Sequence, residues 1–227
     1  MKILGLQKMT LLDYPSKVAC TVFLGGCNFR CPFCHNASVV FMADCEEISK
    51  EELFAFLKKR QGLLDGVCIT GGEPLINDDI YDLFREIRAM GYLIKLDTNG
   101  SFPEKLKYII DEKMADYIAM DIKSSPENYS AAAGTDIDIG KINKSIDFIM
   151  SCGIPYEFRT TVVKGIHTAE DFAKIGERIK GARAYYLQTF KNSGNLIGGG
   201  FESFTSEEMN GFKNLLLPYV PNTQIRE

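Results

Sequence analysis

Short apolar runs alternate with amphipathic stretches along most of this chain. Apolar runs bounded by polar residues indicate buried strands, whereas apolar residues spaced three or four apart indicate helices with one buried side. The runs predict strands at residues 17–24, 66–70, 92–98, 116–123, 156–163 and 184–190. The longer spacings predict helices from about Ser49, at about 80–90, from Pro103, and near 141–152, 169–180 and 206–217.

Local signals support several of these helix boundaries. Ser49 with Glu52, and Thr205 with Glu208, have the spacing of a capping box, in which each side chain bonds the other residue's backbone N–H. Gly91 stands where the second helix should end.

The alternation of strand and helix predicts a parallel sheet with right-handed crossovers. Periodicity by itself does not separate an open doubly wound sheet from a barrel, and six units are two fewer than a full eight-fold barrel needs. We expect a single domain, residues 1–227. The segment 124–140 interrupts the rhythm and is expected to be a loop too polar for the core.

Composition and charge limit the partners and the cellular compartment that we expect for this protein. The formal net charge of −4 provides no electrostatic footprint for nucleic acid or an anionic membrane, so neither is an expected partner. No apolar run approaches about 18 residues, and the N-terminal residues do not form a signal peptide. An odd count of seven cysteines argues against a disulfide framework and favours a reducing, cytoplasmic compartment.

Three of the cysteines lie in one short stretch, "GGCNFRCPFCHN", as Cys27, Cys31 and Cys34. Thiolates bind soft metals, and three ligands so close together can surround one cluster. A partial zinc site is the alternative, with His35 as an awkwardly placed fourth ligand; buried core cysteines are another. An iron–sulfur cluster with one iron left open accounts better for the missing fourth cysteine.

The spacing C-x₃-C-x-φ-C, with Phe33 before the last cysteine, resembles the signature of radical S-adenosylmethionine enzymes. The resemblance implies a 4Fe–4S cluster whose open iron is chelated by S-adenosylmethionine, and a 5′-deoxyadenosyl radical formed when the cluster donates one electron. It also implies an α/β fold that is a partial barrel of six strand–helix units, open on one side.

Further motifs follow the predicted strands: "TGGEPL" at 70–75, "DTNG" at 97–100 and "DIK" at 121–123. Taken alone, the first motif indicates a turn, and the aspartates and lysine of the other two indicate a solvated ion pair. Together they resemble glycyl-radical-enzyme activases, such as the pyruvate formate-lyase and anaerobic ribonucleotide reductase activating enzymes. This resemblance implies a monovalent cation, sodium or potassium, held by Asp97, Thr98 and Asp121, with Lys123 reaching the cofactor.

Two later strands carry further candidates. Arg159 lies between apolar neighbours and needs an anionic partner, either a structural acid such as Glu73 or the cofactor carboxylate. Phe190 stands near a position where activases have a histidine that stacks on adenine, although a core phenylalanine is the alternative. The implied cofactor-binding set is Phe33, Asn36, Gly71, Gly72, Glu73, Asp97, Asn99, Asp121, Lys123, Arg159, Gln188 and Phe190.

The resemblance implies a glycyl radical enzyme as protein substrate, with anaerobic ribonucleotide reductase as the expected partner. It also implies flavodoxin or another low-potential reductant. Two other hypotheses stay open. One is a small-molecule radical enzyme similar to 7-carboxy-7-deazaguanine synthase, with polar side chains from 124–140 and 191–200 around the cofactor. The other is a non-enzymatic iron–sulfur or zinc protein.

Overall fold

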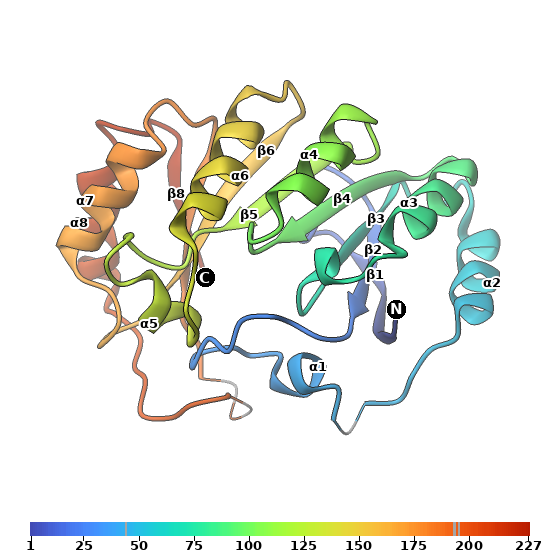
Figure 1. Cartoon of the computed structure of the whole chain (residues 1–227), viewed down its shortest axis with the longest axis horizontal. Coiled ribbons are helices and arrows are strands. Elements are labelled where there is room, and N and C mark those ends of the chain that lie inside the picture. The colour runs from blue at the N-terminus through green and yellow to red at the C-terminus, as the bar shows by residue number, and fades with distance from the viewer. Residues whose placement is uncertain (44, 193, 195) are drawn as a thin grey trace. The chain divides into compact units, whose positions relative to one another are not determined.

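The computed structural model describes residues 1–43, 45–192, 194 and 196–227 (Figure 1). The chain forms two compact units. The first contains Met1–Asn28, Ser38–Thr98 and Glu104–Ile118, and the second contains Phe29–Ala37, Asn99–Pro103 and Ala119–Glu227. Cys27 therefore belongs to the first unit, and Cys31 and Cys34 belong to the second.

Four strands of the first unit pair in chain order: β1 (Ile3–Thr10), β2 (Ala19–Leu24), β3 (Gly66–Gly71) and β4 (Leu93–Thr98). β2, β3 and β4 are parallel, and β1 runs antiparallel to β2. Leu24 lies opposite Gly71, and Ile69 lies opposite Leu96. This register brings the residues after β2, β3 and β4 to one edge of the sheet, as barrel enzymes require for a shared site.

In the second unit, β6 (Tyr156–Val162), β7 (Tyr185–Thr189) and β8 (Thr223–Arg226) are parallel neighbours. β5 (Tyr117–Asp121) straddles the boundary between the units. Neither β1 nor β8 has a second strand partner within its own unit among the described residues. The predicted α/β class and the open, mostly parallel arrangement are confirmed.

The sequence pattern missed both of these end strands. β1 is half-exposed along most of its length, so it carries no continuous apolar run. β8 has only four residues and a polar sequence, TQIR. Its Arg226 makes a bidentate ion pair with the buried Glu157 of β6, with N···O distances of 2.7 and 2.8 Å. A contact between distant residues therefore fixes this strand.

The predicted helices are present: α2 (Lys50–Arg60), α3 (Ile80–Ala89), α4 (Pro103–Asp111), α6 (Ile139–Ser151), α7 (Ala169–Arg178) and α8 (Ser206–Leu216). Both predicted capping boxes are formed, at Ser49 and at Thr205. Figure 1 shows α7 and α8 side by side. The short elements α1 (Ala37–Phe41), η1 (Pro74–Ile76) and α5 (Tyr129–Ala133) were not predicted.

The expectation that residues 124–140 form a loop too polar for the core is wrong. Ser124 and Ser125 are buried, and α5 buries Tyr129. The polar residues are buried because they satisfy a buried carboxylate: Asp171 accepts hydrogen bonds from Ser125 Oγ at 2.5 Å and from Asn128 Nδ2 at 2.7 Å.

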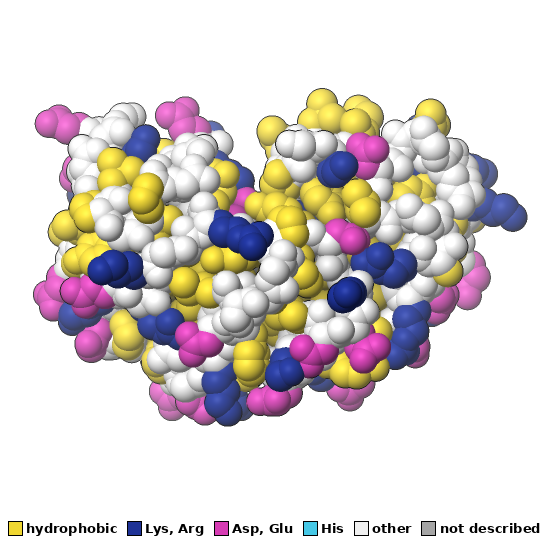
Figure 2. Space-filling view, turned by 90° about the horizontal axis from the view of Figure 1, so that it is seen from above, with side chains coloured by type: hydrophobic (Ala, Val, Ile, Leu, Met, Phe, Trp, Pro, Cys, Tyr) yellow, Lys and Arg dark blue, Asp and Glu magenta, His cyan; other side chains and the backbone are white. Residues whose placement is uncertain are grey.

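No helix in the part of the chain that the structure describes is long and apolar enough to cross a bilayer. Basic and acidic side chains are interspersed over the face shown in Figure 2.

Replacing Ser49 by alanine should lower the free energy of unfolding by about 1 kcal/mol, because the N-cap of α2 loses its bond to the Glu52 N–H. Urea denaturation measures the change. Ser206→Ala, at the first position of α8, leaves the Thr205 cap in place and should change the stability little. Equal losses in the two variants would contradict the capping interpretation.

Candidate cofactor site

The second and third cysteines of the motif form a tight turn in the second unit. The Cys34 N–H donates to the Cys31 carbonyl at 3.0 Å. Cys31 and Phe33 are buried, and Cys34 is half-buried. None of the seven cysteines forms a disulfide in the structure. The turn therefore presents two reduced sulfur atoms three positions apart, and Cys27 follows β2 in the first unit.

Gly71, the last residue of β3, and Gly72, which follows it, permit a close backbone approach within the first unit. Gly71 has a φ of +123°, and a Cβ atom on Gly72 would lie 2.0 Å from the Gly26 carbonyl oxygen and 3.2 Å from Cys27 Cβ. The Glu73 N–H donates to that same Gly26 carbonyl at 2.8 Å. These contacts hold the segment that carries Cys27 against the end of β3, which only glycine permits at position 72.

Glu73 is fully buried and is bonded to the end of the neighbouring strand. Its Oε1 accepts from Thr98 Oγ1 at 2.8 Å and from the Leu75 N–H at 3.0 Å. Two residues predicted as separate ligands thus contact each other directly. Glu73 thereby joins the end of β3 to the end of β4, and its contact with a cofactor stays a prediction.

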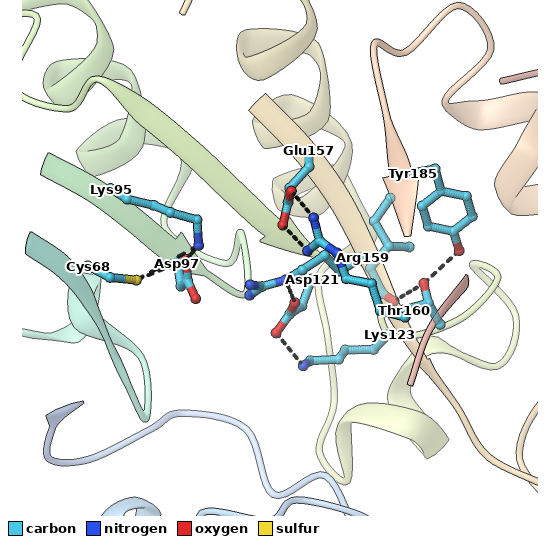
Figure 3. A network of polar contacts seen from close by, with 11 residues as sticks. Cys68, Lys95, Asp97, Asp121, Lys123, Glu157, Arg159, Thr160 and Tyr185 are labelled. Atoms are coloured by element: carbon cyan, nitrogen blue, oxygen red, sulfur yellow. Dashed lines mark hydrogen bonds and ion pairs between the residues drawn. The ribbon is translucent and has the colours of Figure 1, made fainter. Parts of the chain in front are cut away.

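Asp97 is paired with Lys95, which is not among the predicted site residues. Lys95 Nζ is in ion-pair contact with Asp97 Oδ1, and only 1% of the lysine side chain is exposed. Cys68 Sγ lies 3.8 Å from each of these two groups (Figure 3). The sequence did contain a signal for this pair. A lysine within a buried strand needs a partner, and Asp97, two residues later, lies on the same face of the strand as Lys95.

Asp121, Lys123 and Arg159 form an ion cluster in the second unit (Figure 3). Asp121 Oδ1 accepts from Arg159 Nε at 2.8 Å, and Asp121 Oδ2 lies 3.2 Å from Lys123 Nζ. Arg159, expected to need an anionic partner, therefore has one in Asp121. Arg159 is in the middle of β6, but its carbonyl accepts from the Ile122 N–H at 2.8 Å, which sets it level with the end of β5.

Opposite effects act on the ionisation of this cluster. Burial would raise the pKa of Asp121, but the positive charges of Arg159 and Lys123 outweigh it and hold that pKa well below its usual range. Burial would lower the pKa of Lys123, but Asp121 outweighs burial and raises it. Burial raises the pKa of the Cys31 thiol, while the charge of Lys123 acts against burial. A carboxylate flanked by two cations therefore lies near the cysteine turn.

The remaining predicted residues are Phe190, Asn99, Gln188 and Asn36. Phe190 is 1% exposed and packs against the rings of His35, at 5.4 Å between centroids, and Phe201; its stacking on adenine stays a prediction. Asn99 Oδ1 accepts from the N–H and Oγ of Ser101, which stabilises its own turn. Gln188, near the end of β7, and Asn36, after the cysteine turn, are half-buried.

An iron–sulfur cluster needs soft, deprotonated sulfur ligands. No group of three or more histidine, cysteine, aspartate or glutamate side chains is arranged as a metal site within the described residues. The available thiols are nevertheless soft, reduced ligands, two of them in one turn close to Lys123. The Tyr129 hydroxyl, on α5, is buried without a hydrogen-bond partner in the described structure. The residue types fit such a cluster.

Comparisons with known proteins place this arrangement in a wider group. The sequence profile of the Radical SAM superfamily matches residues 21–179. A protein of Methanocaldococcus jannaschii, named as a candidate glycyl-radical enzyme activating enzyme, is 33% identical over 82% of this chain and 79% of its own length. The pyruvate formate-lyase-activating enzyme of Clostridium pasteurianum is 26% identical over 80% of this chain and 77% of its own.

A solved structure shares the fold. The radical SAM methyltransferase from Sphaerobacter thermophilus superposes with a TM-score of 0.76 at 15% identity, covering 96% of this chain and 68% of the methyltransferase. At this identity the likeness concerns the fold alone.

Gly72→Ala should destabilise the protein by about 1–3 kcal/mol, because the new methyl group collides with the Gly26 carbonyl. It should also lower the iron content after anaerobic reconstitution, since the segment carrying Cys27 must move. Gly211→Ala is the matched control: its methyl group would meet no atom within 4 Å, in the middle of α8. Unchanged stability and iron content in the Gly72 variant would contradict the packing described above.

Acid should weaken the second unit by protonating Asp121. Because the pKa of Asp121 is lower in the folded protein than its ordinary value of 3.8, its contribution is present above that value and declines as the pH falls below it. Urea unfolding of the iron-free protein between pH 3 and pH 7 measures this contribution. Asp121→Asn should be less stable at pH 7 and lose less stability below pH 4. An acid limb as steep as that of the unsubstituted protein would contradict the assignment.

Proposed function

Because the chain belongs to the Radical SAM superfamily, in the group of its activating enzymes, we propose that it activates a glycyl radical enzyme. The substrate is a glycine of the partner protein, anaerobic ribonucleotide reductase, which loses one hydrogen atom and becomes a glycyl radical. The observation that carries the proposal is the partly buried cluster of Asp121, Lys123 and Arg159 beside the cysteine turn, in a chain whose activating-enzyme relatives match it over four-fifths of its length.

Cys27, Cys31 and Cys34 would hold a 4Fe–4S cluster, with S-adenosylmethionine at the coordination position that the protein leaves open. When bound, this pair supplies a 5′-deoxyadenosyl radical by one-electron cleavage of the sulfonium. Phe33 shields the cysteine turn from water, since it is only 4% exposed. Residues 1–227 act together as one catalytic domain.

The charges of the second unit suit an anionic ligand. Asp121 supplies one negative charge, whereas Lys123 and Arg159 supply two positive charges, and the three side chains are between 13% and 30% exposed. An anionic ligand with one negative charge would be stabilised by both cations, because partly buried charges are favourable when they are paired. The methionyl carboxylate of S-adenosylmethionine has that charge and can accept hydrogen bonds from both cations.

Binding of sodium or potassium by Asp97, Thr98 and Asp121 remains a prediction. Each aspartate already has a basic partner, Lys95 for Asp97 and Lys123 with Arg159 for Asp121. Gly71, Gly72 and Glu73 would contact the amine end of S-adenosylmethionine through their backbone and the single glutamate side chain. The electron donor would be flavodoxin or another low-potential protein.

The small-molecule alternative has less support. It needs free polar side chains from residues 124–140 around the cofactor, but Ser124, Ser125 and Asn128 donate to Asp171 instead. In the 191–200 segment, positions 193 and 195 lie outside the described residues.

The test is anaerobic reconstitution with iron and sulfide, followed by reductant, S-adenosylmethionine and an anaerobic ribonucleotide reductase. Electron paramagnetic resonance should show a glycyl radical on the reductase, with 5′-deoxyadenosine as the co-product. Cys31→Ala should abolish both signals. Cys152→Ala, at a half-buried cysteine outside the motif, should retain them. Absence of a glycyl radical on any glycyl radical enzyme, with turnover of a small molecule instead, would overturn the proposal.

A further inference from the structure

His167 lies between β6 and α7, is 3% exposed, and has both ring nitrogens engaged. The Val163 N–H donates to Nδ1 at 3.0 Å, and Nε2 lies 2.7 Å from the Lys123 carbonyl oxygen. A backbone amide can only donate and a carbonyl can only accept. The ring is therefore neutral with its proton on Nε2, which donates to Lys123.

The same ring contacts the cysteine motif. The His167 and Phe33 rings meet edge to face, with centroids 6.2 Å apart, and on α7 the Phe172 ring lies 5.7 Å from His167. His167 thus touches the aromatic residue between Cys31 and Cys34 and also bonds the backbone of Lys123.

The position of His167 is itself fixed by the start of α7. Thr168 and Asp171 form a capping box, and the Asp171 carboxylate also accepts from Ser125 and Asn128. The segment after β5 is consequently attached to the start of α7 at two places, through the Lys123 carbonyl and through Ser125.

We propose that His167 is a positioning residue that sets Lys123 and Phe33 relative to each other, so that Lys123 meets the carboxylate of S-adenosylmethionine beside the cysteine turn. This inference rests on the proposed function. It assigns to His167 a hydrogen-bonding role without contact to the reacting atoms. Burial lowers the pKa of His167 and so favours the neutral ring that the role requires. The hydrogen bonds to the Lys123 and Val163 backbone and the charge of Asp171 oppose burial in part, whereas the positive charge of Lys123 acts in the same direction as burial.

Two substitutions separate the two hydrogen bonds. Asparagine can place an acceptor near the position of Nδ1 and keep the Val163 bond, whereas glutamine can place a donor near the position of Nε2 and keep the Lys123 bond. In the reconstituted holoenzyme, His167→Asn should weaken S-adenosylmethionine binding about tenfold, because the buried Lys123 carbonyl loses its donor. It should also reduce the change that S-adenosylmethionine causes in the electron paramagnetic resonance spectrum of the reduced cluster.

His167→Gln should stay within about threefold of the unsubstituted affinity and retain the spectral change. If His167 were purely structural, the two variants would lose equal affinity for S-adenosylmethionine, in proportion to their loss of thermal stability. That result overturns the proposal, as does unchanged affinity in His167→Asn.

Nitrogen-15 histidine spectra of the unsubstituted, oxidised holoenzyme supply a measurement that does not depend on a variant folding. A charged ring, or a proton on Nδ1, overturns the proposal as well.

Failure of the proposed function gives a different result. If the unsubstituted holoenzyme binds and cleaves S-adenosylmethionine but activates no glycyl radical enzyme, the choice of protein substrate is wrong while the comparison of His167 variants still stands. If the unsubstituted protein forms no cluster that binds S-adenosylmethionine, the proposed function itself fails.

Discussion

The sharing of the single carboxylate of Asp121 between Lys123 and Arg159 is the interaction on which the second unit's site depends. Charges at this depth are expensive unless they are paired, so the three residues must be brought together from two strands and the residues that follow. The backbone supports this pairing: the Ile122 N–H donates to the Arg159 carbonyl, and Thr160 Oγ1 donates to the Ile122 carbonyl at 2.7 Å. The register of β5 against β6 therefore determines which charged side chains meet, and the ion pairs in turn stabilise that register.

Buried carboxylates fix the other segments that follow strands. Glu73 joins the end of β3 to Thr98 on β4, and Asp171 attaches residues 124–128 to the start of α7. A buried carboxylate without donors would cost several kcal/mol, and each one therefore specifies which groups must surround it. This requirement lets irregular segments hold side chains in defined positions, as a site that binds a small cofactor needs.

Sequence patterns identified the helices and the parallel strands because those signals are local. Ser49 and Thr205 act within one helical turn, and the apolar runs of β2 to β7 are contiguous in the chain. β1, β8 and α5 were missed since they are short or polar and depend on distant partners, as Arg226 depends on Glu157. The same reason explains Lys95, whose burial makes sense only beside Asp97.

The sequence by itself determined the chemistry of this protein: three closely spaced cysteines, glycines after one strand, and acidic and basic residues after others. Residue type and spacing are properties of the covalent chain, and they were enough to indicate a family and an open α/β fold. Only the tertiary structure decided the pairings. It paired Arg159 with Asp121, packed Phe190 against His35, and brought His167 between Lys123 and Phe33. Partner choice depends on register and on the satisfaction of buried polar groups, which are properties of the folded chain as a whole.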